Sequence, residues 1–149
     1  MLAWRTCKTR HDPYDGTGAA LEGARWNSPG RPVVYASDSF AGSILEILVH
    51  SARPRTLPGT HHAVRVDIPD DLVERLEPDR LPGWDLPSSL EARAFGDRWL
   101  ADGRSAVLVV PSVPGRPVGR TVLINLLHPQ AGRIARGAPF AVPWDERLF

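Results

Sequence analysis

An arginine, an indole and an amide occur together at Arg25-Trp26-Asn27, just before a turn and an extended apolar run. The planar guanidinium of an arginine presents a fork of donors that matches phosphate or carboxylate oxygens, and it also stacks on aromatic rings. The triplet therefore indicates a site that binds phosphate or stacks on a base. A surface arginine engaged in salt bridges is the alternative interpretation.

A second candidate is the carboxylate of Glu46, which lies within the apolar run 44–49. A carboxylate costs free energy to bury unless a partner compensates its charge. If Glu46 faces a cleft, it can stabilise a developing positive charge. If it lies on the outer face of a helix, it is solvated, and the helical pattern leaves both arrangements open.

Other patterns favour ordinary structural roles. The run Gly16-Thr17-Gly18-Ala19-Ala20 lacks a preceding strand and a following Lys-Ser/Thr pair, so a flexible loop is predicted rather than a nucleotide-binding loop. The five histidines show no paired metal-binding spacing, since His61 and His62 are adjacent. Ser112 lacks the glycine-flanked turn of a serine hydrolase, and by itself indicates a proline-bounded turn. We therefore expect no metal.

The elements that position these residues must be short, because Gly and Pro total 28 of 149 residues and fall in clusters. Apolar patterning predicts strands over 33–36, 62–68, 106–110 and 122–124, and helices over 39–50 and 88–102. The run 106–110 predicts a central strand covered on both faces. In the second helix, burial is predicted for Leu90, Ala94, Trp99 and Leu100. Elements interleaved in this way predict an α+β domain, with a central mixed sheet flanked by short helices.

Length and composition indicate a single domain spanning residues 1–149, with 42% hydrophobic and 23% charged residues. The net charge of +1 combines 17 arginines and one lysine with 17 acidic residues. It also hides a positional asymmetry, because residues 67–102 carry 10 acidic and 4 basic groups between two basic flanks. A balance so close to neutral argues against direct nucleic-acid binding, which normally uses a clearly basic surface.

The sequence also bears on location. The lone Cys7 allows no disulfide within the chain, which fits a reducing compartment. No apolar run like that of a signal peptide follows Met1, and the longest strongly apolar stretch, 106–110, is far shorter than a membrane span. We therefore expect a soluble cytoplasmic protein without a membrane partner.

Several segments, taken in order, resemble the RES domain family. In the first half these are Trp4-Arg5, Gly23-Ala24-Arg25-Trp26-Asn27, Pro32-Val33-Val34-Tyr35-Ala36-Ser37 and Leu45-Glu46. In the second half they are Gly96-Asp97-Arg98-Trp99-Leu100, Leu108-Val109-Val110-Pro111-Ser112, Leu123-Ile124-Asn125 with His128-Pro129, and Asp145-Glu146-Arg147-Leu148. The resemblance covers nearly the whole chain. Ala24, where many relatives have glycine, and Leu126-Leu127 before the His-Pro pair depart from the pattern.

The resemblance implies the toxin of a bacterial toxin-antitoxin pair, with a fold related to ADP-ribosyltransferases. It implies depletion of NAD by cleavage of the nicotinamide-ribose bond, through hydrolysis or phosphorolysis, with ADP-ribosylation of a protein as an alternative. NAD is then a substrate and inorganic phosphate a possible co-substrate, and no other cofactor is expected. The implied partner is a helix-turn-helix antitoxin that blocks the active site in a hetero-oligomer. The acidic stretch 67–102 is a candidate surface for a basic antitoxin.

By the same resemblance, Arg25, Tyr35, Glu46 and Ser112 correspond to the site residues of the family, with Asn125 as a further substrate-binding residue. Cleavage of the nicotinamide-ribose bond leaves a ribose with oxocarbenium character, so the site must hold two phosphates and stabilise a cation. We expect Arg25 to bind phosphates, and Glu46 to bond ribose hydroxyls and face the cation. Tyr35 is expected to pack on nicotinamide or its ribose, and Ser112 to orient ribose or amide.

Two interpretations from other classes remain open. The 17 arginines and five histidines allow an RNA-binding or RNA-cleaving protein, for which a steep salt dependence of RNA binding is diagnostic. A non-catalytic partner of a DNA-binding protein is the other, and it predicts complex formation without NAD turnover.

Overall fold

The computed structural model describes residues 1–50 and 59–149, and in this part of the chain eight strands form one sheet. The strands are β1 (Leu2–Lys8), β2 (Val33–Ser37), β3 (His61–Asp67), β4 (Val73–Arg75), β5 (Val107–Pro111), β6 (Arg120–Asn125), β7 (Ala135–Arg136) and β8 (Phe140–Ala141). The α-helices are α1 (Thr17–Glu22), α2 (Phe40–Val49) and α3 (Leu90–Asp102). Short 3-10 turns cover Asp70–Leu72, Pro78–Arg80, Ala131–Arg133 and Glu146–Leu148.

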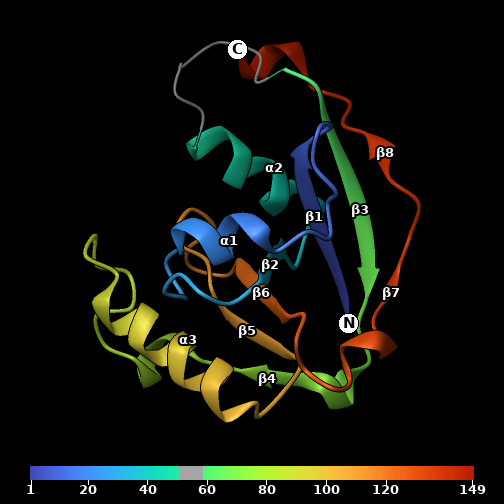
Figure 1. The fold of residues 1–149 in the computed structure, drawn as a ribbon. Helices are drawn as coiled ribbons and strands as arrows, with labels where there is room; N and C mark the ends of the chain where they lie inside the picture. Colours follow the sequence, from blue (N-terminus) through green and yellow to red (C-terminus); the bar gives the residue numbers. More distant parts are fainter. Residues whose placement is uncertain (51–58) are drawn as a thin grey trace.

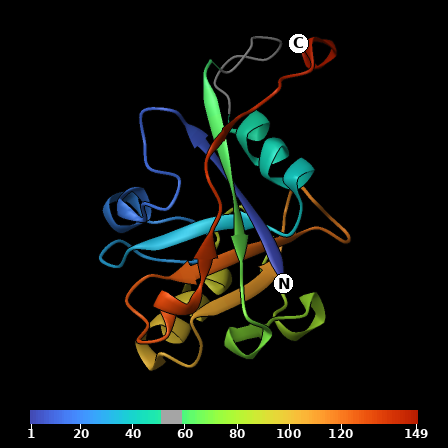
Figure 2. The same cartoon turned by 90° about the vertical axis from the view of Figure 1, so that its right-hand side faces the viewer.

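The sheet is mixed and curled. Its order is β4-β5-β6-β2-β1-β3-β7, with β8 pairing with β3 beside β7. The β4–β5 pair is parallel and the other pairs are antiparallel. Strands β1 and β3 run steeply across those of the β2–β6–β5 half, with α2 beside β1 and α3 beside β5 (Figures 1 and 2). The predicted α+β class with a mixed sheet and short helices is confirmed.

The two halves of the sheet separate between β1 and β2. These strands share the register pair Trp4↔Ser37, whereas β1 pairs with β3 along its whole length. Beyond this point β1 turns toward α2, where the hydroxyl groups of Thr6 and Ser43 are 2.8 Å apart in a buried hydrogen bond. Because of this separation, β1 does not pair with the middle of β2, on the side where α2 packs.

The core lies on both faces of the sheet. One packed cluster includes Val34, Val109 and Ile124, and the other includes Tyr35, Leu108 and Leu123. Alternation of side chains along β2, β5 and β6 accounts for this division. Strand β5 is buried at every position and lies between β4 and β6, so the predicted central strand at 106–110 is confirmed.

Helix α3 differs from the predicted pattern. Leu90 is 65% exposed and Ala94 is also exposed, whereas Ala92, Gly96, Trp99 and Leu100 are buried. The prediction was correct for Trp99 and Leu100 and wrong for Leu90 and Ala94. At Gly96 the helix packs directly against the Trp26 main chain, and this contact sets which face of the helix is buried.

The amino-terminal third also holds elements that the patterning missed. Residues 17–22 form helix α1, so the predicted flexible loop at 16–20 is wrong. A Cβ on Gly16 would lie 2.7 Å from the Val33 main-chain nitrogen, so this glycine is needed where α1 meets β2. Strand β1 escaped prediction because charged and polar residues, among them Arg5 and Thr6, occupy positions that the fold buries.

The acidic segment 67–102 forms ion pairs within the chain. Seven of its ten acidic residues pair with described cationic groups, mainly arginines of the two basic flanks: Asp67 with Arg65, Asp70 with the amino terminus, Asp71 with Arg133, Glu74 and Asp102 with Arg104, Glu77 with Arg120, and Asp85 with Arg116. The hydrogen bonds from Arg133 lower the pKa of Asp71. The charge blocks in the sequence are therefore complementary to one another in the fold.

None of the helices in the described ranges is long and apolar enough to cross a bilayer.

Candidate active site

Arg25 lies in a tight turn between α1 and β2. Gly23, at the end of α1, has a φ of +69°, and a side chain there would lie 2.8 Å from the Asn27 carbonyl oxygen, so the turn requires glycine. Ala24 and Asn27 close the turn through main-chain hydrogen bonds. The Nη1 of Arg25 donates to the carbonyl oxygens of Trp84 and Leu86, at 3.2 and 2.9 Å. The turn therefore fixes the guanidinium at the edge of the 81–89 loop.

Trp26 is a core residue rather than a surface for stacking a base. Its side chain is 2% exposed, and its ring stacks on Trp84 with centroids 6.4 Å apart. The hypothesis of base stacking at this triplet is therefore wrong for the indole, because burial leaves its ring faces inaccessible.

Tyr35 connects this turn to the sheet. Its hydroxyl group donates to Asn27 Oδ1 at 2.7 Å and accepts from the Trp26 main-chain nitrogen at 3.2 Å. Burial of the phenol raises its pKa well above the usual range, and the negative charge of Asp97 adds to this effect. Tyr35 is therefore a neutral phenol whose hydroxyl is already bonded to the turn that carries Arg25.

Glu46 and Ser112 meet across the fold. Ser112 follows directly after β5, and its hydroxyl group donates to Glu46 Oε1 at 3.3 Å. Ser112 Oγ in turn accepts from the Gly115 main-chain nitrogen at 3.1 Å, so the Ser112 hydroxyl group both donates and accepts a hydrogen bond. His50, one turn along α2, places Nε2 3.7 Å from Glu46 Oε2. The Glu46 side chain is 35% exposed, so the carboxylate is held on one side and open on another.

Tyr35 and Ser112 lie on one face of the sheet. Tyr35 packs in the same cluster as Val110 and Val113, the residues that flank the Pro111–Ser112 segment. The 81–89 loop contacts the segment after Ser112, since Asp85 pairs with Arg116 at 2.8 Å. The same loop receives the hydrogen bonds from Arg25. The 81–89 loop therefore connects the turn that carries Arg25 with the segment that follows Ser112.

Asn125 lies elsewhere. It is at the far end of β6, where its main chain pairs with Val33 of β2 and bonds to Ala106 at the start of the β5 segment. Its Oδ1 accepts from the Leu127 nitrogen at 3.1 Å, which is a turn-forming contact. About six residues of strand, or roughly 20 Å, separate this end of the β5–β6 hairpin from Ser112. The geometry thus gives Asn125 a turn-forming contact and places it away from Ser112.

Arg5 is a residue near the site that the sequence reasoning did not assign. Burial lowers the pKa of this guanidinium. Its Nη1 donates to the Tyr35 carbonyl oxygen at 3.0 Å, which lies where β1 and β2 separate, and its buried Nε has no hydrogen-bond partner among the described residues. The signal available in the sequence was an arginine within an otherwise strand-like run, and spacing alone does not reveal its burial.

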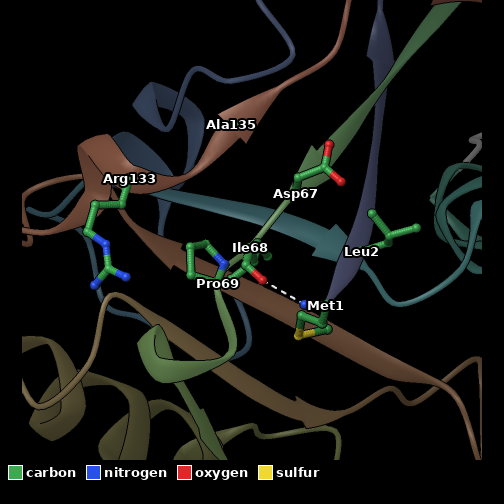
Figure 3. Close-up of a pocket in the computed structure, with 7 residues that line it drawn as sticks. All are labelled: Met1, Leu2, Asp67, Ile68, Pro69, Arg133 and Ala135. Carbon is green, nitrogen blue, oxygen red and sulfur yellow. Dashed lines mark hydrogen bonds between the residues drawn. The ribbon is translucent and has the colours of Figure 1, made fainter.

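Two cavities lie on the described surface. One of about 250 Å³ adjoins the Glu46–Ser112 pair and is lined by Ser37, Asp38, Ser39, Ala41, Gly42, Leu45, Ser112, Gly115, Val118, Gly119 and Arg120. The other, of about 410 Å³, lies among Met1, Leu2, Asp67, Ile68, Pro69, Arg133 and Ala135 (Figure 3). There Asp67 pairs with Arg65, and Arg133 with Asp71, so both charges are already satisfied. The smaller cavity is the one lined by Ser112, the hydrogen-bond partner of Glu46.

The described residues contain no group of three or more His, Cys, Asp or Glu side chains arranged to hold a metal ion. The four candidate residues offer one carboxylate, one guanidinium and two hydroxyl groups.

The chain is an α+β domain with a curled mixed sheet, in which a carboxylate on a short helix contacts a serine at the end of a strand. A sequence model of the RES domain matches residues 2–145, and the chain belongs to the RES domain family. It is 37% identical over 150 residues to the "Toxin Res" of Pseudomonas putida, covering 100% of both chains. It is 38% identical to the "Prs ADP-ribosylating toxin" of a Sphingobium strain, covering 80% of this chain and 76% of that one.

Among solved structures, the fold is similar to one described as the M. tuberculosis MbcT-MbcA toxin-antitoxin complex. The TM-score is 0.78 with 18% sequence identity, and the match covers 95% of this chain and 83% of that chain. At this identity the likeness concerns the fold.

Removal of the Ser112 hydroxyl (S112A) is expected to lower turnover about 10- to 100-fold, because Glu46 loses its donor and the Gly115 N–H loses its acceptor. The Michaelis constant should change less than kcat, since Ser112 acts through Glu46. Steady-state kinetics measure both quantities. S88A, at an exposed serine, is the control, and equal kinetics for the two variants would contradict the role.

The Tyr35 phenol is expected to ionise at a higher pH than a free tyrosine, whose pKa is about 10, because burial disfavours the phenolate. Because its pKa is raised in the folded protein, Tyr35 contributes its full stability below the pKa of a free tyrosine. This contribution is lost as the pH rises from that value through the folded pKa. The wild-type minus Y35F difference in ultraviolet absorbance isolates its titration from that of Tyr14. Ionisation of Tyr35 at the free value would contradict the burial of the phenol.

Proposed function

We propose that this protein cleaves the bond between nicotinamide and ribose in NAD, and that it acts as a toxin by depleting NAD. The observation that carries the proposal is the Glu46 carboxylate. It is held by Ser112 on one side, open on the other, and placed beside a cavity. The family membership and the relatives named as toxins support the same conclusion.

The reaction requires little from the protein beyond position and charge. When the C1–N bond of the nicotinamide ribose breaks, its electron pair leaves with neutral nicotinamide, and positive charge develops on the ribose. A carboxylate fixed beside that carbon stabilises the charge, and the stabilisation is large because the group needs no rearrangement during the reaction. We assign this role to Glu46.

Arg25 and Tyr35 bind and position the substrate in this proposal. Arg25 uses Nη1 for the 81–89 loop, and the described residues give Nε and Nη2 no hydrogen bond, so these donors are available for pyrophosphate oxygens. Tyr35 presents a neutral ring on the same face of the sheet. The attacking group is water, which then loses a proton, or inorganic phosphate, whose oxygen forms the new bond to ribose.

A protein acceptor in place of water or phosphate is a second candidate function. The Sphingobium relative with 38% identity is named as an ADP-ribosylating toxin, and the first chemical step is the same in both reactions. The two functions differ only in which nucleophile attacks the ribose.

We also propose a protein partner, an antitoxin of the helix-turn-helix class that covers the site in a hetero-oligomer. The structural neighbour described as a toxin-antitoxin complex supports this proposal.

One assay tests the enzymatic proposal. Purified protein is incubated with NAD, with and without inorganic phosphate, and the products are separated by chromatography. Release of nicotinamide together with ADP-ribose indicates hydrolysis. Release of nicotinamide together with a phosphorylated ADP-ribose indicates phosphorolysis. Incorporation of label from adenine-labelled NAD into a protein indicates transfer. Folded protein that releases no nicotinamide with or without phosphate would rule out hydrolysis and phosphorolysis.

A further inference from the structure

We propose that Asp97 is a positioning residue, which sets from α3 the turn that carries Arg25 and the hydrogen bond that orients Tyr35. Its kinetic consequence rests on the proposed function.

Both oxygens of the Asp97 carboxylate bind one residue of the turn. Oδ1 accepts from the Ser28 main-chain nitrogen at 2.8 Å, and Oδ2 accepts from the Ser28 hydroxyl group at 2.6 Å. A charged acceptor makes both bonds stronger than neutral ones. Ser28 follows α3 because it has two points of attachment to a single side chain.

The helix also touches the turn on either side of Ser28. A Cβ on Gly96 would lie 1.7 Å from the Trp26 carbonyl oxygen, so α3 packs directly against this peptide group. Arg93 Nε donates to the Ala24 carbonyl oxygen at 3.4 Å, and Arg31 Nη1 donates to Leu100 at 2.9 Å. Helix and turn therefore move together.

The position of Ser28 is transmitted to Tyr35 through Asn27. Asn27 is fully buried, and its Nδ2 donates to the carbonyl oxygens of Ala19 and Ser28 at 2.9 Å each. With the amide nitrogen fixed in this way, Oδ1 points to the Tyr35 hydroxyl group, 2.7 Å away. The Trp26 nitrogen donates to the same hydroxyl group. A displaced Ser28 therefore misplaces both partners of the phenol.

The same displacement acts on Arg25, three residues before Ser28 in the turn. From its place in the turn, Arg25 reaches the Trp84 and Leu86 carbonyl oxygens. Its remaining donors are those we assign to the pyrophosphate. Asp97 thus acts on substrate binding through the turn and without contact with the reacting atoms.

The test combines D97N, S28A and the double variant, with E91Q as a control that removes a carboxylate from an exposed position of the same helix. D97N and S28A should each raise the KM for NAD about tenfold and change kcat less than threefold, equivalent to about 1.4 kcal/mol of binding. The KM of the double variant for NAD should be no higher than the higher KM of the two single variants, because both substitutions act on the same contact. E91Q should match the wild type.

A readout independent of turnover separates this proposal from the NAD assignment. Hydrogen exchange of the main-chain amides of residues 24–28 should accelerate at least tenfold in D97N and remain unchanged in E91Q. Unchanged exchange in D97N, additive kinetic effects in the double variant, or a lower melting temperature with wild-type KM each overturn it. If D97N does not fold, S28A decides by the same measurements. A wild type that leaves NAD intact refutes the proposed function, and the exchange data still test the positioning of the turn.

Discussion

Replacement of Glu46 by glutamine (E46Q) is expected to lower kcat for NAD cleavage by about a thousandfold, equivalent to about 4 kcal/mol of transition-state stabilisation. Glutamine keeps the shape of the side chain and an oxygen for the Ser112 hydroxyl, so the hydrogen bond at 3.3 Å has a replacement acceptor. What is lost is the negative charge that faces the ribose cation. The melting temperature should therefore stay close to that of the wild type.

Nicotinamide release under saturating NAD measures the change in kcat. E22Q is the control, because Glu22 is an exposed carboxylate at the end of helix α1. Retention by E46Q of more than a tenth of wild-type turnover would remove Glu46 from the proposed chemistry. A large fall in melting temperature would instead show that the carboxylate holds the fold.

Gly96→Ala is expected to produce the largest loss of stability, about 3 kcal/mol or more, and to disrupt the turn that carries Arg25. The added methyl group would meet the Trp26 carbonyl oxygen at 1.7 Å, a main-chain atom that cannot rotate away. The helix has to move off the turn, which also separates Asp97 from Ser28. Chemical denaturation, followed by the fluorescence of the stacked pair Trp26 and Trp84, measures the loss.

The matched control is Gly18→Ala. Gly18 lies in helix α1, and a methyl group there meets nothing within 4 Å. Alanine favours a helix by about 1 kcal/mol over glycine, so G18A should be neutral or stabilising. Similar stability for G96A and the wild type would mean that α3 and the turn separate easily, contrary to the packing described.

The strands and helices with a clear apolar period were predictable from the sequence. The runs at 33–36 and 106–110 match β2 and β5, and 39–50 contains α2. Strand β1 was not predictable, because it buries Arg5 and Thr6, which patterning treats as exposed. The exposure of Leu90 was equally hidden, since it depends on how closely α3 approaches the Trp26 peptide.

The site residues show the same division. Residue types and resemblance selected Arg25, Tyr35, Glu46 and Ser112, and the fold sets Ser112 against Glu46 and Tyr35 against the turn that carries Arg25. Patterning left open whether Glu46 faces a cleft, because a helical period does not say what lies opposite; the contact with Ser112, 66 positions later in the chain, is created only by the tertiary fold. Asp97 carried no signal of its own, since two bonds to a residue 69 positions earlier are a property of the tertiary fold.

The ion pairs of segment 67–102 affect the rate constant with which this protein associates with other molecules. Acidic groups such as Asp71, Glu74 and Asp85 are each neutralised within about 3 Å by an arginine from a flanking segment, so little of their field extends beyond the surface. Association of a basic protein with this surface then gains little from electrostatic steering, and its rate constant depends weakly on ionic strength. Recognition must come from the fit of surfaces after collision rather than from attraction at a distance.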